Sequence, residues 1–297
     1  MTEINWLASG AVSALYAAAA VARGQVLTDS RLAQALAPPV EKLLAGMSAA
    51  GLAEPAFWRH AVPLAGTREN DHDLADQIVG HMTGTRPTEE MVARLAGALR
   101  DVRQTFDRAR PDAVRELTLR TGPLRELWEA RGPGHLAAIR RFTEPAVIVQ
   151  RALVYAVPPI AGGGGEAYAS EHAVAIEAVL ANPHAALPEV VRLGWLVARL
   201  GSEALGAASG IAPSKLSQLV AVATLMPALA AAEWVELATF DTSTIALALH
   251  AWQGVKSEQA NDAAVTLHRW WQTYAGDRVP WADAMAALDH MLIAESI

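Results

Sequence analysis

Apolar residues recur along this chain mostly three or four positions apart, which is the period of helices that bury one face. The clearest example is the stretch TEEMVARLAGALRDVRQTFDRARP, residues 88–111. Thr88 can cap its first turn, acidic residues follow where the helix dipole favours negative charge, and arginines gather near its end. We expect one amphipathic helix here, closed by Pro111.

Glycine and proline divide the rest of the helical pattern. Residues 4–22 are apolar nearly all round and predict a buried helix. Two short helices are expected on either side of Pro38 and Pro39, because proline fixes φ and lacks a backbone donor. Glycine–proline turns cut residues 112–145 into three short helices. Further helices are expected at residues 170–181, 187–201, 213–237 with a kink at Pro227, 241–254, 257–274 and 281–294.

The segment AVIVQRALVYAV, residues 146–157, is ambiguous. Its β-branched residues favour a strand, whereas Thr143 and Pro145 resemble a helix start. The helical surroundings favour a helix, and a strand remains the alternative.

These elements predict an all-α fold, an irregular multi-helical domain of about a dozen helices with at most one short strand pair. No fixed repeat of solenoid length is found in the sequence. The chain is long enough for two lobes. We place an N-terminal helical lobe at residues 1–110 and a C-terminal helical lobe, which contains the glycine-rich loop, at residues 111–297.

Composition indicates a folded chain and narrows its partners. Hydrophobic residues make up 52% and charged residues 19%, far from the disordered class. The formal net charge is −7 and the arginines are spread along the chain, so nucleic acid is not expected as a partner. Because there is no cysteine, disulfides, thiolate zinc sites, iron–sulfur ligation and a cysteine nucleophile are excluded.

We expect a soluble, cytoplasmic protein. The apolar start carries Glu3 and has no Lys or Arg ahead of it, which does not fit a signal peptide. No stretch of ~20 strongly apolar residues free of charge and turn residues supports a membrane span. We therefore expect no membrane partner. The sequence carries no signal for a particular oligomeric state.

Four consecutive glycines, Gly162, Gly163, Gly164 and Gly165, precede a segment that is predicted to be helical. Such a run can expose successive backbone N–H groups at a helix start and cradle an anion. It lacks the lysine and Ser/Thr of a nucleotide P-loop, and the charge of Glu166 directly after it would oppose a bound phosphate. A turn is the stronger interpretation. A ligand cradle is the alternative, because a close backbone approach would explain the entropic cost of four glycines.

His172 and Glu177 are not expected to form a metal or acid–base pair, because five residues on a helix point them to different faces. His172 is expected to pack among apolar neighbours, with a ligand role as the alternative. The stretch DHDLADQIVGH, residues 71–81, gathers acids and histidines, but acids at a helix start are explained by the helix dipole. We therefore expect no metal and no cofactor, and no G-x-S-x-G nucleophile motif is present.

Arginines beside the glycine–proline turns are candidates for a ligand site. Trp128 belongs to an apolar helical stripe that Arg131 continues, and Arg140 adjoins a similar stripe. A guanidinium rarely enters apolar surroundings unpaired, so each needs a carboxylate, a helix C-terminus or an anionic ligand. Internal pairing is the stronger interpretation. With a ligand, Trp128, Arg131, Arg140 and His172 would join the glycines in one site.

Residues 187–200 predict a central helix, because Glu189, Arg192 and Arg199 form one narrow polar stripe and the rest is apolar. Only that stripe is expected to meet water. The nine tryptophans of the chain are expected to brace the core, with a pocket lining as the alternative.

We infer a non-catalytic binding or assembly protein from these features. Its small anionic ligand or protein partner would sit where the 162–165 loop meets the arginine-bearing helices. An enzyme that acts on an anionic small molecule in the same pocket is the alternative, ranked second because no catalytic motif is present. In a third hypothesis, the glycines are only a loop of a structural interaction module.

Overall fold

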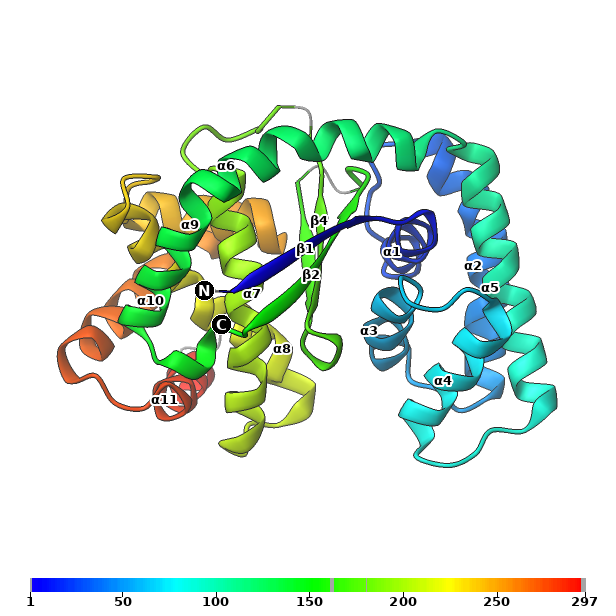
Figure 1. Cartoon of the computed structure of the whole chain (residues 1–297). Helices are drawn as coiled ribbons and strands as arrows, with labels where there is room; N and C mark the ends of the chain where they lie inside the picture. The colour runs from blue at the N-terminus through cyan, green and yellow to red at the C-terminus, as the bar shows by residue number, and fades with distance from the viewer. Residues whose placement is uncertain (1, 161–162, 180, 295–297) are drawn as a thin grey trace.

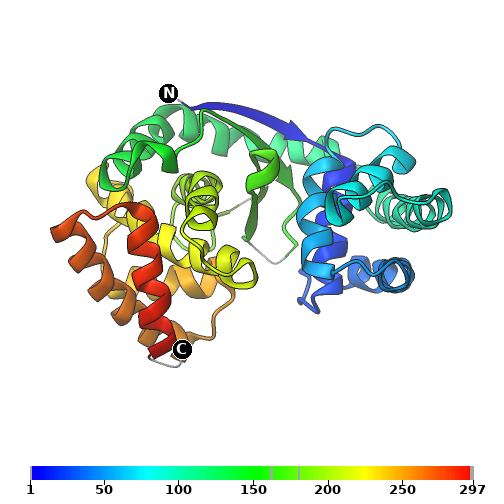
Figure 2. The ribbon, with the colours of Figure 1, turned by 90° about the horizontal axis from the view of Figure 1, so that it is seen from below.

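The computed structural model describes residues 2–160, 163–179 and 181–294. Over these residues the chain forms eleven α-helices and one four-stranded mixed sheet. The expected all-α fold with at most one short strand pair is therefore wrong. The helices form two lobes with the sheet between them, as Figure 1 and Figure 2 show.

The sheet joins the two halves of the sequence. Its strands are β1 (Glu3–Ala8), β2 (Arg151–Val157), β3 (Gly165–Tyr168) and β4 (Ala173–Glu177), in the order β1-β2-β4-β3. The first three in that order are parallel, and β3 is antiparallel to β4. The strand alternative for residues 146–157 is thus the right one at β2. The helix expected at 170–181 is wrong, because Ala173–Glu177 form the strand β4.

The N-terminal segment splits into a strand and a helix. Exposed and half-buried residues alternate along β1, and Ser9 then caps α1 (Gly10–Ala22) by accepting a hydrogen bond from the Val12 N–H group. The helix expected over residues 4–22 is therefore wrong in its first part. Alternation of Glu3 and Asn5 with Ile4 and Trp6 is the period-two signal of a strand.

The remaining helices of the N-terminal lobe are α2 (Ser30–Ala49), α3 (Glu54–Leu64), α4 (Asp71–Thr83) and α5 (Glu89–Ala109). The amphipathic helix with its Thr88 cap is confirmed at α5. Pro38 and Pro39 lie inside a continuous α2 instead of separating two helices. The reason is burial. Leu32 and Leu36 before the prolines and Val40, Leu43 and Met47 after them are buried on one face of α2, which packs along α5.

Helix α6 (Ala113–Phe142) crosses the top of the molecule in Figure 1 and connects the lobes. Three short helices were expected here, but Pro123 and Pro133 lie inside one helix of 30 residues. Burial again outweighs the local breakers, because Leu124, Trp128 and Ile139 enter the same core. The Trp128 ring covers Gly132, where an added Cβ would lie 2.4 Å from Trp128 Cδ2.

The C-terminal lobe is built around α7 (Glu189–Ala208), whose buried Trp195 and Leu196 confirm the expected central helix. The other helices are α8 (Pro213–Trp234), α9 (Thr242–Gln253), α10 (Ser257–Asp277) and α11 (Trp281–Ala294), with short 3-10 turns at Pro145–Val147 and Ala169–Glu171. Among the described residues, α8 alone is long and apolar enough to span a membrane. It is mostly buried inside the protein, as in the core helix of a soluble protein.

Two hydrophobic cores lie on opposite faces of the sheet. Val154, Val174 and Ile176 join the core of the C-terminal lobe, whereas Tyr155 and Val157 join the core of helices α1 to α5. This division follows from the alternation of side chains along a strand. Both lobes therefore depend on the same sheet, and a boundary between residues 110 and 111 stays a prediction.

Candidate functional site

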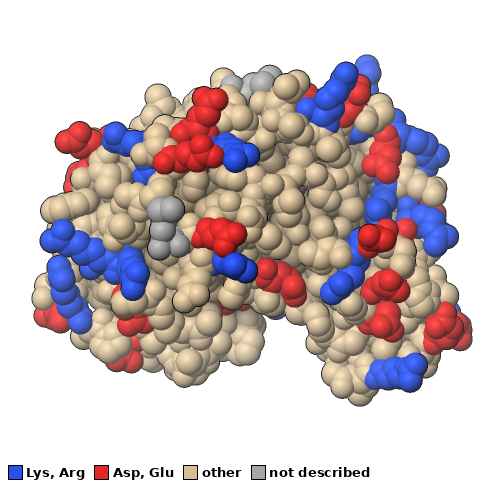
Figure 3. Space-filling model, in the orientation of Figure 1, with Lys and Arg blue, Asp and Glu red and all other residues tan. Residues whose placement is uncertain are grey.

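A cleft of about 690 Å³ lies between the lobes, beside the strand β3. It is lined from one lobe by α1, the turn after it and the start of α3, and from the other by α7, the first half of α8 and the end of α9. In the space-filling view the lobes are separated by a notch at their lower edge (Figure 3). Because ligand sites are concave and favour junctions between lobes, this cleft is the candidate functional site.

Arginines from both lobes converge on the cleft. Arg23 follows α1, Arg59 lies on α3, and Arg199 lies on α7. The Glu166 carboxylate on β3 bridges two of them, with Oε2 3.3 Å from Arg23 Nη1 and Oε1 3.2 Å from Arg199 Nη2. Arg59 forms no ion pair within the described part of the chain. The lining thus holds three guanidinium groups and one carboxylate.

A buried polar network fixes the glycine loop behind this cleft. Glu177, at the end of β4, accepts hydrogen bonds from the Gly163 N–H group at 2.7 Å and from the Tyr16 hydroxyl at 3.3 Å. Arg192 donates to the Gly163 carbonyl, and its Nη2 lies 2.8 Å from both the Glu177 carbonyl and the Glu189 carboxylate. Burial lowers the pKa of Arg192, while both carboxylates oppose that shift. The loop is therefore held by charge-assisted bonds.

Aromatic rings line the same cleft. Trp195 stacks on Trp252 with 5.5 Å between ring centroids, and the Arg199 guanidinium lies 5.1 Å from the Trp195 ring centroid. Burial raises the pKa of Tyr16 and Tyr168 well above 10, so both phenols stay protonated at neutral pH. Tyr16 therefore keeps the proton that it donates to Glu177, Tyr168 can donate a hydrogen bond into the cleft, and neither supplies a phenolate base.

Glu203 lies near this group and responds to its charges. Burial raises the pKa of its carboxyl group, and Arg199 and Arg59 partly oppose the shift. The positive field of the two arginines thus extends to the carboxyl group of Glu203, which does not itself line the cleft.

The structure brings part of the predicted glycine site to the cleft. Gly164 and Gly165 line it, Gly163 lies beside Arg192 with φ of 131°, and Gly162 is outside the described residues. The run leads into β3 and not into a helix, so the predicted helix start directly after the glycines is wrong. The arginine-bearing helix that meets the glycines is α7, with Arg192 and Arg199.

The other predicted site residues lie elsewhere. Arg131 Nη2 donates to the Val235 carbonyl at 2.5 Å, the helix C-terminus that was one of its expected partners, and Arg140 is exposed on α6. Trp128 is buried in the core of the C-terminal lobe. His172 is exposed in the turn before β4, with φ of 45°, so packing of its ring on a helix face is wrong. None of these four side chains lines the interlobe cleft.

The sequence did not predict that Arg23 and Arg59 line the cleft. It also did not predict that Arg192 and Arg199 of α7 are buried at the glycine loop and the cleft. The polar stripe of Glu189, Arg192 and Arg199 was expected to meet water, but Arg192 is only 3% exposed and Arg199 5%. A polar stripe on a helix that is otherwise buried was the available signal, because such a stripe must meet either water or other charges. Arg23 and Arg59 carry no comparable local pattern.

The acidic stretch at residues 71–81 is used in ion pairs. Asp71 lies 2.6 Å from Arg103, and His72 lies 2.9 Å from Glu89. Within the described ranges, no three histidine or acidic side chains gather closely enough to hold a metal ion.

Comparison of the chain with protein families, with curated proteins and with solved structures finds no match. The site is therefore interpreted from its own geometry.

Proposed function

We propose that this protein binds a small anionic molecule in the interlobe cleft. The observation that carries the proposal is the convergence of Arg23, Arg59 and Arg199 from both lobes on a cleft in which Glu166 is the one lining carboxylate among the described residues. The surplus of positive charge attracts an anion to a chain whose net charge is −7. Arg59, which forms no salt bridge among the described residues and acts on Glu203 through its field, is the cation most readily offered to the anion.

The rest of the lining suits a polar ligand. Gln25, Ser214, Ser217 and Gln218 present amide and hydroxyl groups along the turn after α1 and the first turns of α8. Because these groups and the arginines come from both lobes, a bound anion would connect the lobes. The absence of cysteine supports the cytoplasm as the compartment in which we propose that this binding occurs.

A thermal-shift titration tests the proposal with inorganic phosphate, pyrophosphate and citrate at constant ionic strength. Binding of an anion to the native state raises its melting temperature. We expect at least one of the three anions to do so, and we expect the shift to fall strongly in Arg59→Gln. Arg94→Gln is the matched control, because Arg94 is exposed on α5, away from the cleft, and forms its ion pair with Glu90.

Equal shifts in wild-type and Arg59→Gln protein would reject the cleft as the binding site. No shift with any of the three anions would reject an anion site of this kind. Calorimetric titration of the same variants then gives the affinity lost with the guanidinium group.

A further inference from the structure

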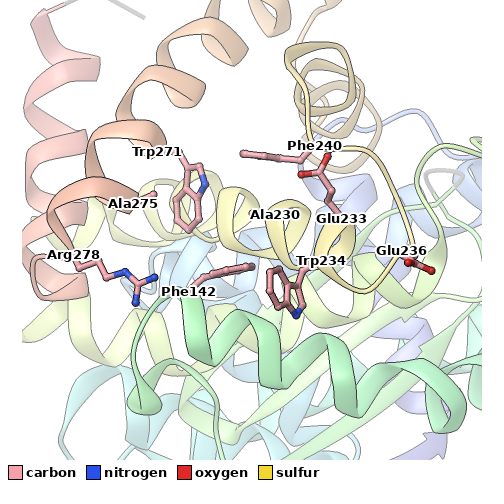
Figure 4. A pocket seen from close by; sticks show the side chains of 9 residues that line it. All are labelled: Phe142, Ala230, Glu233, Trp234, Glu236, Phe240, Trp271, Ala275 and Arg278. Carbon is pink, nitrogen blue, oxygen red and sulfur yellow. Dashed lines mark hydrogen bonds between the residues drawn. The ribbon is translucent and has the colours of Figure 1, made fainter.

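A second pocket, of about 470 Å³, lies in the C-terminal lobe away from the interlobe cleft. Its walls are four aromatic side chains from different segments: Phe142 ends α6, Trp234 ends α8, Phe240 follows in the loop before α9, and Trp271 lies on α10. Figure 4 shows these rings around one hollow. The remaining polar lining consists of Glu233, Glu236 and Arg278.

The four aromatic rings contact one another in two pairs, but the pocket stays open to solvent at Trp234. Phe142 meets Trp234 edge to face with 6.1 Å between centroids, and Phe240 meets Trp271 in the same way at 6.4 Å. Trp234 is nevertheless 59% exposed, which is unusual for a large apolar side chain on a protein surface. The Arg141 guanidinium already lies 4.9 Å from its ring centroid, so this indole attracts a cation.

The charged residues occupy opposite ends of the hollow. Arg278 lies on one side of Phe142 and Trp234 in Figure 4, and Glu236 lies on the other, with Glu233 above Trp234. Glu233 also accepts a hydrogen bond from the Phe240 N–H group at 3.0 Å, which ties the loop to the end of α8. The pocket therefore presents carboxylates at one end, a guanidinium at the other and aromatic rings between them.

The backbone at both ends adopts a conformation that favours glycine. Glu236 follows α8 with φ of 58°, and Arg278 ends α10 with φ of 50°. Glycine is the usual residue at such helix ends, and this chain uses Gly84 after α4 and Gly254 after α9. Of the three described non-glycine residues with positive φ, two line this one pocket and carry opposite charges.

Strained backbone that is retained with a particular side chain points to a role for that side chain. The carbonyl groups at the end of α8 have hydrogen-bond donors. The Leu237 N–H group donates to the Ala232 carbonyl at 2.8 Å, and Arg131 donates to the Val235 carbonyl. Glycine at 236 would keep these bonds without strain. Compared with glycine, Glu236 adds only its carboxylate side chain to this position. In the same way, Arg278 adds its guanidinium group at the end of α10.

We propose that this pocket binds a small zwitterion that carries a quaternary ammonium group and a carboxylate. The ammonium group lies against the Trp234 and Phe142 rings near Glu236 and Glu233, and the carboxylate pairs with Arg278. Aromatic faces attract quaternary ammonium groups, which cannot be bound by hydrogen-bond donation, and the nearby carboxylates add to that attraction. Arginine supplies paired donors that match a carboxylate. This site is independent of the anion cleft.

Ligand-observed NMR titration tests the proposal with trimethylammonio-acetate, -propanoate and -butanoate, since the chain length decides whether both ends are reached. The best of the three is then compared with two analogues of equal shape. One replaces the nitrogen by carbon and loses the positive charge, and the other replaces the carboxylate by a hydroxymethyl group. We expect each analogue to bind on the order of ten-fold more weakly, as the loss of one charged contact implies.

Glycine variants separate ligand binding from folding. Glu236→Gly and Arg278→Gly relieve backbone strain and remove one charge each, so we expect binding to weaken by several-fold while the melting temperature does not fall. His172→Gly is the matched control, because His172 has the same backbone conformation in the β3–β4 turn, outside this pocket. It should leave binding unchanged. Trp234→Ala, at an exposed position, should remove most of the binding.

The proposal is overturned if none of the three zwitterions binds, or if the uncharged carbon analogue binds as tightly as the zwitterion. It is also overturned if Glu236→Gly and Arg278→Gly bind like His172→Gly.

Discussion

Gly165 lies where β3 approaches α7 most closely. An added Cβ would lie 2.7 Å from Leu196 Cδ1 and 2.8 Å from the Ala175 carbonyl oxygen. At Gly164 the nearest atoms are Glu177 Oε1 at 3.4 Å and the Tyr16 hydroxyl at 3.6 Å, which is nearly ordinary contact. Glycine is thus required for a close backbone approach at one position of the run, and another position, Gly163, has a positive φ of 131°.

Gly165→Ala should destabilise the protein by about 1–3 kcal/mol, the cost of overpacking a well-packed site. Gly164→Ala should cost less, because its φ is not positive and its Cβ has room. Urea unfolding of the two variants gives the comparison. Equal losses would show that β3 and α7 are not in close contact.

Leu196→Ala should cost about 2–5 kcal/mol, the range for a buried large-to-small change. Leu196 is fully buried at the centre of α7 and faces the sheet at Gly165. A denaturant midpoint close to wild type would contradict the central position of this helix. Leu119→Ala, at a 75% exposed position on α6, is the control and should change stability little.

At the scale of elements, α6, α7 and α8 meet around the buried His135. Its Nε2 lies 2.8 Å from the Ala228 carbonyl on α8, and Gly194 on α7 leaves room for the ring, since an added Cβ would lie 2.3 Å from Nδ1. Nδ1 has no hydrogen-bond partner in the described structure. Burial lowers the pKa of His135 from 6.5 to about 4, because a charged imidazolium would be desolvated there.

Stability should therefore fall as the pH drops from 6.5 towards 4. In that window the unfolded chain takes up a proton at this histidine while the folded chain does not, so acid favours unfolding. The full contribution is present above pH 6.5, and the shift corresponds to a loss of about 3 kcal/mol at the acid end. Unfolding free energies measured across this window check the slope. His135→Gln should flatten it, and an unchanged slope would show that other groups cause it.

Helices could be predicted from the sequence where apolar spacing and caps agree, as in α5 with Thr88 and in α7. Helix lengths could not be predicted where prolines occur. Proline disfavours a helix interior, but the burial of apolar side chains in α2 and α6 outweighs that cost. The sheet was missed because β4, AVAIE, is buried on both faces and short, and such a run does not differ from a buried helix by periodicity.

At the scale of the whole molecule, the Glu166 carboxylate connects the lobes by pairing with Arg23 of one and Arg199 of the other. The sequence predicted a site at the glycine loop and a central helix at α7. It did not predict that α1 and α3 line the same cleft. Parallel pairing of β1 with β2 brings the N-terminal lobe next to residues 151–157, and neither segment carries a local signal for its partner.

Glu166→Gln should raise the affinity of the cleft for pyrophosphate, because it frees Arg23 and Arg199 from an internal carboxylate. The change should lower stability by about 1–3 kcal/mol, since the buried Arg199 loses its ion-pair partner. Calorimetric titration and urea unfolding measure the two effects. Weaker pyrophosphate binding would contradict competition between Glu166 and the ligand. Glu90→Gln, which breaks an exposed pair on α5, should change neither.

Glu3 of β1 pairs with Arg151 of β2, so β1 cannot join the sheet during synthesis until about 150 further residues have been added. A ribosome that adds ~5–20 residues per second needs roughly 7–30 s between the emergence of β1 and that of β2. For that time the helices after β1 can fold, whereas β1 has no strand to pair with and exposes Ile4 and Trp6. The nascent chain therefore carries an open, partly apolar strand until residues 151–157 have been made, and this is the interval in which association between unfinished chains competes with folding.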